Sequence, residues 1–174
     1  MDFIYSFVSP GVLSQVLVGL SRTVILFIVS SGLSLILGVL RIPNVAHGSL
    51  YMIGAYMAFN ISHVFGGSDM GFWLALVGAP LGVALVSLIA ERGLFQYLYE
   101  REHIMLLLLT FAVSLIFGDL VKIVWGAEYK SVPVPQIFQG FVKIFGGLPF
   151  PKYNTFLLVM GPLVAIALWL IVNK

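Results

Sequence analysis

The chain alternates long apolar runs with short polar stretches, and each long run is about the length of a membrane helix. A helix needs about 20 predominantly apolar residues to cross the hydrocarbon core of a bilayer. The runs contain no Asp, Glu, Lys or Arg apart from Asp119, which lies near the end of the fourth. The pattern therefore predicts five helical membrane segments: Thr23–Leu40, Ile42–Ser62, Phe72–Ala90, Ile104 to about Leu120, and Tyr153–Asn173.

The residues before Thr23 either extend the first segment or form an element of their own. The first segment reaches back to Val12 if Arg22 faces protein or an interface. Proline, glycine and scattered serines in Phe3–Ser21 favour an additional interfacial or entering helix. Asp2 is the only early charge and no small-x-small cleavage site follows, so this stretch is not typical of a signal peptide.

The connections between the apolar runs differ in length and charge. Gly66–Gly71 has the composition of a tight turn, and Glu91–His103 is a loop of mixed charge. Lys122–Lys152 contains four prolines with aromatic residues between them, which predicts a surface loop with a short interfacial helix at Phe138–Phe145.

Lysines and arginines near the segment ends are almost equally divided between the two sides, so their number does not fix the orientation. Most arginines fall in short connections, where the positive-inside rule is more reliable. We therefore expect the N-terminus outside, Glu91–His103 on the cytoplasmic side and Lys122–Lys152 on the external side.

Composition separates this chain from soluble proteins. Of its 174 residues, 60% are hydrophobic and 9% are charged, whereas soluble domains carry about 25% charged residues. The chain is therefore expected to be an all-α polytopic transmembrane bundle whose second segment is broken. A net charge of +2 without a basic run argues against nucleic-acid binding. The absence of cysteine excludes disulfides and thiolate metal sites.

The second segment begins with the polar stretch Arg41–Tyr56, RIPNVAHGSLYMIGAY. Polar groups at membrane depth are expensive and usually mark function or pair with a neighbouring helix. On a continuous helix, Asn44, His47 and Tyr51 would share one face, while Ser49 and Tyr56 would point elsewhere. Contact with a small polar solute and hydrogen bonding to another helix both remain open for this face.

The same stretch contains two residues that interrupt a helix. Pro43 and Gly48 predict an irregular start that becomes regular helix by about Leu50. Metal binding is not expected, because His47 has no second His, Cys or carboxylate nearby in the sequence.

Small residues recur at helical spacing in three of the segments. Residues four apart permit close helix approach in lipid, which favours bundle packing for all three sets, although some of these faces would instead border a translocation path. The sets are Ser30, Ser34 and Gly38 in the first segment, Gly78 and Gly82 in the third, and Thr110, Ser114 and Gly118 in the fourth. Asp119 and Lys122 are spaced for a local ion pair.

No catalytic motif accompanies these features. The sequence has no GxSxG, no HExxH and no P-loop GxxxxGK[ST]. We therefore expect no enzymatic activity and no cofactor, and any ATP used in transport would be bound by another subunit.

The polar stretch and the segment before it resemble a known family. SSGLSLILGVLRIPNVAHGSLYMIGAY is similar to the N-terminal signature of the bacterial permease subunits of branched-chain amino acid ABC transporters, the Liv-type permeases. Glu91-Arg92 resembles the family's E-R pair, and Trp125-Gly126 with Ser131-Val132-Pro133 resembles its W-G…S-x-P loop. The matching residues of the signature are Gly32, Leu33, Leu35, Ile36, Gly38, Arg41, Asn44, Ala46, His47, Gly48, Tyr51, Met52, Gly54, Ala55 and Tyr56.

The chain departs from the family pattern at three points. Val45 replaces the usual phenylalanine, which is a conservative change. Ser49 stands where many members have glutamate, which puts a charged role there in doubt. Family members are also longer and carry a later loop that docks the ATPase. Residues 1–174 are accordingly expected to be the N-terminal part of one permease domain, as a fragment, a truncated product or half of a split permease.

The resemblance implies a multi-pass subunit of the bacterial plasma (inner) membrane that forms part of a pore. Its implied partners are a second permease subunit, ATP-binding cassette subunits and an external substrate-binding protein. Asn44, His47, Gly48, Tyr51 and Tyr56 are then candidates for the substrate path or for a structural motif. The alternative is a channel or secondary carrier for a small polar solute of the urea or amide type, which would work without an ATPase.

Overall fold

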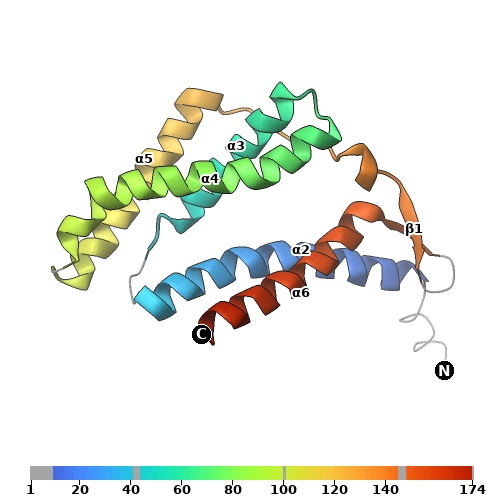
Figure 1. The fold of residues 1–174 in the computed structure, drawn as a ribbon, viewed down its shortest axis with the longest axis horizontal. Helices are drawn as coiled ribbons and strands as arrows, with labels where there is room; N and C mark the ends of the chain where they lie inside the picture. Colours follow the sequence, from blue (N-terminus) through green and yellow to red (C-terminus); the bar gives the residue numbers. More distant parts are fainter. Residues whose placement is uncertain (1–9, 41–43, 100, 145–147, 174) are drawn as a thin grey trace. The chain divides into compact units, whose positions relative to one another are not determined.

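A computed structural model describes residues 10–40, 44–99, 101–144 and 148–173 of the chain. Within these ranges five long helices follow one another, joined by short 3-10 turns and one β-hairpin (Figure 1). The helices are α2 Pro10–Leu35, α3 His47–Val64, α4 Asp69–Gly93, α5 His103–Trp125 and α6 Lys152–Val172, and α2 continues into the π-helical turn η1 Ile36–Leu40. The predicted all-α, polytopic membrane architecture is confirmed.

Four of these helices are long and apolar enough to cross a membrane. They cover Gly11–Gly38, Asp69–Gly93, His103–Trp125 and Lys152–Val172, which correspond to the first, third, fourth and fifth predicted segments. The first helix includes Arg22 and runs back without a break to Pro10, so most of Phe3–Ser21 belongs to it. Residues 3–9 of that stretch lie outside the described residues.

The second predicted segment, Ile42–Ser62, forms the shorter helix α3 and is not one of the four. Its 18 residues rise ~27 Å, slightly less than the hydrocarbon thickness of about 30 Å. His47, Asn60 and His63 also make it less apolar than its neighbours. The prediction of five full crossings is therefore supported for four.

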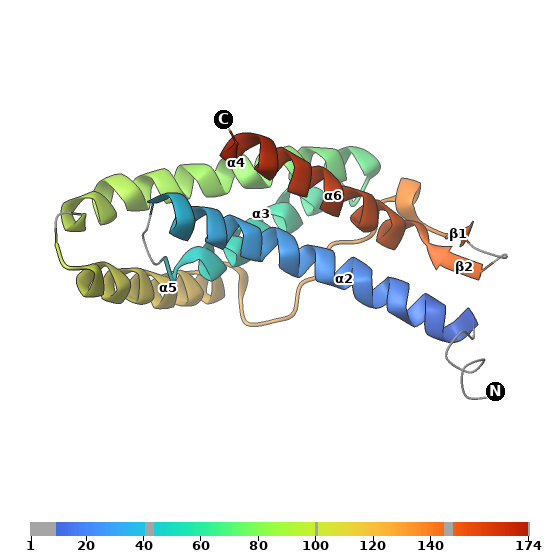
Figure 2. The ribbon, with the colours of Figure 1, turned by 90° about the horizontal axis from the view of Figure 1, so that it is seen from below.

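The predicted interfacial helix at Phe138–Phe145 is wrong. After the 3-10 turn η3 Gln136–Phe138, strand β1 Phe141–Ile144 pairs antiparallel with β2 Leu148–Pro151 (Figure 2). Gly140 has φ +89°, a left-handed conformation that favours glycine and interrupts helix before β1. The prolines of β2 cannot donate backbone hydrogen bonds, which suits a two-stranded edge better than a helix interior.

The chain divides into two compact units, Gly32–Pro135 and Met1–Ser31 with Gln136–Lys174. In the second unit, a Cβ atom added to Gly161 of α6 would lie 3.0 Å from both methyl groups of Val24 on α2. Phe138, Tyr153 and Phe156 form a cluster of rings whose centroids are 4.6–6.5 Å apart. This cluster connects η3 to the first turn of α6.

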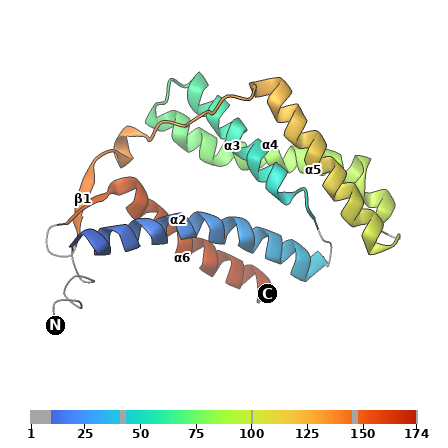
Figure 3. The same ribbon diagram turned by 180° about the vertical axis from the view of Figure 1, so that it is seen from behind.

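In the unit Gly32–Pro135, helices α3 and α4 lie side by side (Figure 3). Cβ atoms built on Gly78 and Gly82 would lie 2.9 Å from Ile61 Cδ1 and 2.6 Å from Met57 Sδ, respectively. The packing role of the GxxxG pair stays a prediction, and these are the contacts on which it depends.

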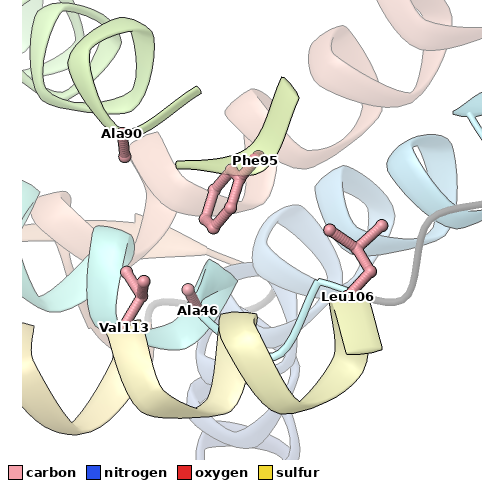
Figure 4. Packing of buried hydrophobic residues seen from close by; sticks show 5 residues of the cluster. All are labelled: Ala46, Ala90, Phe95, Leu106 and Val113. Atoms are coloured by element: carbon pink, nitrogen blue, oxygen red, sulfur yellow. The ribbon is translucent and has the colours of Figure 1, made fainter. Parts of the chain in front are cut away.

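A buried apolar cluster joins the start of α3 to α4, α5 and the 3-10 turn η2 Phe95–Leu98. Figure 4 shows the Phe95 ring directed towards Ala46, with Leu106 and Val113 of α5 on either side, and Ala90 completes the cluster. The start of α3, the end of α4 and the start of α5 therefore lie at the same end of this unit.

Labelling of the two connections that contain Gln96 and Gln136 would test the predicted orientation of the chain in the membrane. Gln96 and Gln136 are both exposed, and the chain has no native cysteine, so single cysteines at these positions would be the only thiols of the chain. In intact cells, we expect an impermeant thiol reagent to label Gln136→Cys and to leave Gln96→Cys unlabelled until the membrane is opened. Labelling at position 96 with protection at position 136 would reverse the orientation.

The glycine contacts generate a second prediction, about stability. A Cβ at Gly71 would lie 2.9 Å from Phe65 Cβ and 3.3 Å from the Ser62 carbonyl oxygen, neither of which can move without the backbone. We expect Gly71→Ala to lower the free energy of unfolding by about 1–3 kcal/mol. Gly82→Ala should cost less, because the flexible Met57 thioether can shift.

Gly118→Ala is the matched control for both substitutions. Nothing lies within 4 Å of a Cβ at this helical position, so the change should be neutral or stabilising by about 0.5–1 kcal/mol. Unfolding in detergent would rank the three variants by their free energy of unfolding. An equal decrease in all three would contradict the packing account.

Candidate functional site at the broken start of α3

Within the polar stretch, Asn44, Val45 and Ala46 form a break in regular helix before α3, as the sequence predicted. Asn44 is non-helical, Val45 and Ala46 form a turn, and regular helix begins at His47. The backbone N–H of His47 donates to the Asn44 carbonyl over 3.3 Å, and the N–H of Leu50 donates to the Ala46 carbonyl over 3.0 Å. Arg41, Ile42 and Pro43 lie outside the described residues. The irregular start and the recovery of helix before Leu50 are confirmed.

The predicted single face of Asn44, His47 and Tyr51 is not formed. Asn44 precedes the helix, so only His47 and Tyr51 share a helical face. The side-chain oxygen Oδ1 of Asn44 is buried and has no hydrogen-bond partner among the described residues. Tyr51 is 53% exposed. The prediction of a shared face assumed a helix that already includes Asn44, whereas regular helix begins only at His47.

The His47 ring packs closely against Gly32, near the end of α2. A Cβ atom on Gly32 would lie 3.3 Å from His47 Cε1 and 3.4 Å from Nε2. This distance is tighter than ordinary van der Waals contact, so a residue without a side chain fits best at position 32. The π-helical turn η1 begins at Ile36, four residues after Gly32, and such turns are rare and often occur at functional sites.

Two hydroxyl groups of α5 contact the break and the first turn of α3. The sequence had placed both in a small-residue face, for which helix packing was favoured and a border of the translocation path was the alternative. The Val45 N–H donates to Thr110 Oγ1 over 3.3 Å. Ser49 is buried, and its Oγ lies 2.7 Å from Ser114 Oγ and 3.2 Å from the Ser114 carbonyl oxygen. The small-residue spacing on α5 was the only signal for these contacts.

Of the remaining candidates, Gly48 and Tyr56 belong to α3. The Tyr56 ring packs against Trp125 with centroids 5.4 Å apart, near the C-terminal end of α5. Gly48 is exposed and has open space around its Cα. Ser30, Ser34 and Gly38 are exposed as well. Their roles stay predictions.

Apart from Arg22, which lies within α2, the charged groups among the described residues lie near helix ends or in the connections. Lys122 pairs with Asp119 over 3.0 Å, as predicted, and both side chains are exposed, so the pair contributes little stability. Tyr99 donates a hydrogen bond to Glu91, and burial together with this negatively charged neighbour raises the pKa of Tyr99 to about 12. Among the described residues, no three His, Asp or Glu side chains gather as metal ligands would.

Comparison with known proteins agrees with the motif. Residues 15–174 match the family described as "Branched-chain amino acid transport system / permease component". The chain is 25% identical over 118 residues to the high-affinity branched-chain amino acid transport system permease protein LivH of Escherichia coli. The protein of the same name from Salmonella typhimurium is 24% identical over 119 residues. Both alignments cover 65% of this chain and 38% of the relative. No solved structure gives a significant match.

Proposed function

This chain belongs to the family of permease components of branched-chain amino acid transport systems, and we propose that it forms part of the membrane path of an ABC importer for branched-chain or other hydrophobic amino acids. The observation that carries the proposal is the family match over residues 15–174, which includes the whole polar break. The LivH relatives match over only 38% of their length, so substrate and assembly are part of the proposal.

The depth of the break supports a role in the path. Val45 contacts Thr110, which lies seven residues inside α5, or ~10 Å from its first residue along the helix axis. A buried Asn44 oxygen without a described partner and the neighbouring His47 ring therefore lie below the end of a membrane helix. Polar groups at such depth border an aqueous path or a binding site more often than lipid.

The proposed mechanism involves no covalent chemistry on this chain. Asn44 and His47 would meet the polar end of the amino acid as it passes, and the apolar helices would form the walls of the path. ATP would be hydrolysed by separate ATP-binding cassette subunits, so this chain needs no cofactor. A second permease subunit would complete the path, and an external binding protein would deliver the solute at the bacterial inner membrane.

Dependence on ATP tests the class of transporter. For the complete complex reconstituted in liposomes, we expect uptake of leucine only when ATP and active ATPase subunits are present. An ATPase variant that binds but does not hydrolyse ATP serves as the control. Equal uptake of leucine or of urea without ATP would contradict the proposal and support the channel or carrier alternative.

His47 provides the test at residue level. In the complete permease, His47→Leu roughly keeps the side-chain size and removes both ring nitrogens. We expect uptake per inserted molecule to fall severalfold while the amount in the membrane holds. His63→Leu, at the other, exposed end of the same helix, should leave uptake unchanged. An unchanged rate per inserted His47→Leu molecule would assign this histidine to packing alone.

A further inference from the structure

Thr110 is the most completely buried hydroxyl residue of α5, with 1% of its surface exposed. Its Oγ1 donates to the Leu107 carbonyl of the same helix over 3.0 Å. The hydroxyl proton is therefore used within α5. A lone pair of Oγ1 accepts the hydrogen bond from the Val45 N–H, in the turn before α3. Thr110 thus connects two parts of the chain that are 65 residues apart in sequence.

The Val45 N–H lies in the turn before α3. The acceptor that the structure gives it is the Thr110 hydroxyl of α5. The N-cap residue of α3 is Ala46, which makes no side-chain cap hydrogen bond. Away from water, an unsatisfied backbone N–H is costly.

A second contact repeats this arrangement one helical turn further on. Ser49 lies four residues after Val45, Ser114 lies four residues after Thr110, and the two serine hydroxyls are 2.7 Å apart. Four residues are close to one turn of an α-helix, so both contacts fall on one face of α5. Two hydrogen-bonded contacts in register resist both sliding and rotation of the start of α3 along α5.

We infer that Thr110 and Ser114 are positioning residues, whose hydroxyls fix the broken start of α3 to α5 and thereby hold Asn44 and His47 in place. These two residues act through the break and need no contact with the solute. The break and α5 then move together during transport. The consequence for uptake rests on the proposed function, whereas the anchoring itself does not.

Backbone hydrogen exchange measures the anchoring directly, because the Val45 N–H is itself the donor. The complete complex in lipid nanodiscs is compared with its Thr110→Val form, which keeps the shape of the side chain and loses the hydroxyl. We expect the amides of Val45–Leu50, with that of Val45 foremost, to exchange about three- to tenfold faster, as the loss of one interhelical hydrogen bond implies. Thr110→Ser restores the hydroxyl and should restore slow exchange.

Thr23→Val is the matched control, because the Thr23 hydroxyl also donates within its own helix, to the Gly19 carbonyl over 3.0 Å, from an exposed position. It should leave exchange of Val45–Leu50 unchanged. Unaltered exchange in Thr110→Val, equal acceleration in Thr23→Val, or failure of Thr110→Ser to restore protection would each overturn the inference.

The contact between Ser49 and Ser114 provides a second test if the Thr110→Val variant does not assemble into the complete complex. Ser114→Ala removes one hydroxyl with little change in volume and should accelerate exchange of the same amides. Ser31→Ala is its control, because the Ser31 hydroxyl donates to the Ile28 carbonyl of its own helix. If the proposed function holds, uptake per inserted molecule falls in Thr110→Val and recovers in Thr110→Ser. Accelerated exchange with normal uptake would keep the anchoring and contradict its role in transport.

Discussion

Backbone groups inside a membrane must find hydrogen-bond partners within the protein, and this constraint decides how the break before α3 is built. An ordinary membrane helix satisfies the constraint by itself. Between the π-helical turn η1 and His47, regular α-helix is absent from the described residues, and the Val45 N–H relies on Thr110. The break is therefore stable only together with α5, so an irregular and polar segment can persist among apolar helices.

Packing of α3 between α4 and α5 supports this arrangement. On one side, glycines of α4 allow Ile61 and Met57 to approach closely. On the other, hydroxyls of α5 meet Val45 and Ser49. The apolar cluster around Phe95 then joins all three helices where α3 begins. Helix α3, which has the most polar sequence of the five, thus has α4 on one side and α5 on the other, as expected for a polar element at membrane depth.

The sequence predicted the elements much better than their partners. Long uncharged runs located four membrane helices, and Pro43 located the break, because both signals are local. The hairpin at Phe141–Pro151 was missed because a proline-rich loop with aromatic residues carries no clear strand period. The pairing of Val45 with Thr110, and of Tyr56 with Trp125, depends on tertiary packing between distant segments. A single sequence offers only small-residue spacing as a hint of it.

Exposure of the break to an alternating aqueous path is the central claim, and thiol accessibility at Gly48 tests it most directly. A Cβ at this position meets nothing within 4 Å, and the chain has no native cysteine, so Gly48→Cys should give one well-defined thiol. In the reconstituted complex, its reaction rate with a small water-soluble thiol reagent would be measured without nucleotide and during ATP-driven transport. We predict that the thiol reacts in at least one state and that its rate changes severalfold between the two. A thiol that stays unreactive in both states would show that the break is covered by lipid or protein, which contradicts this account.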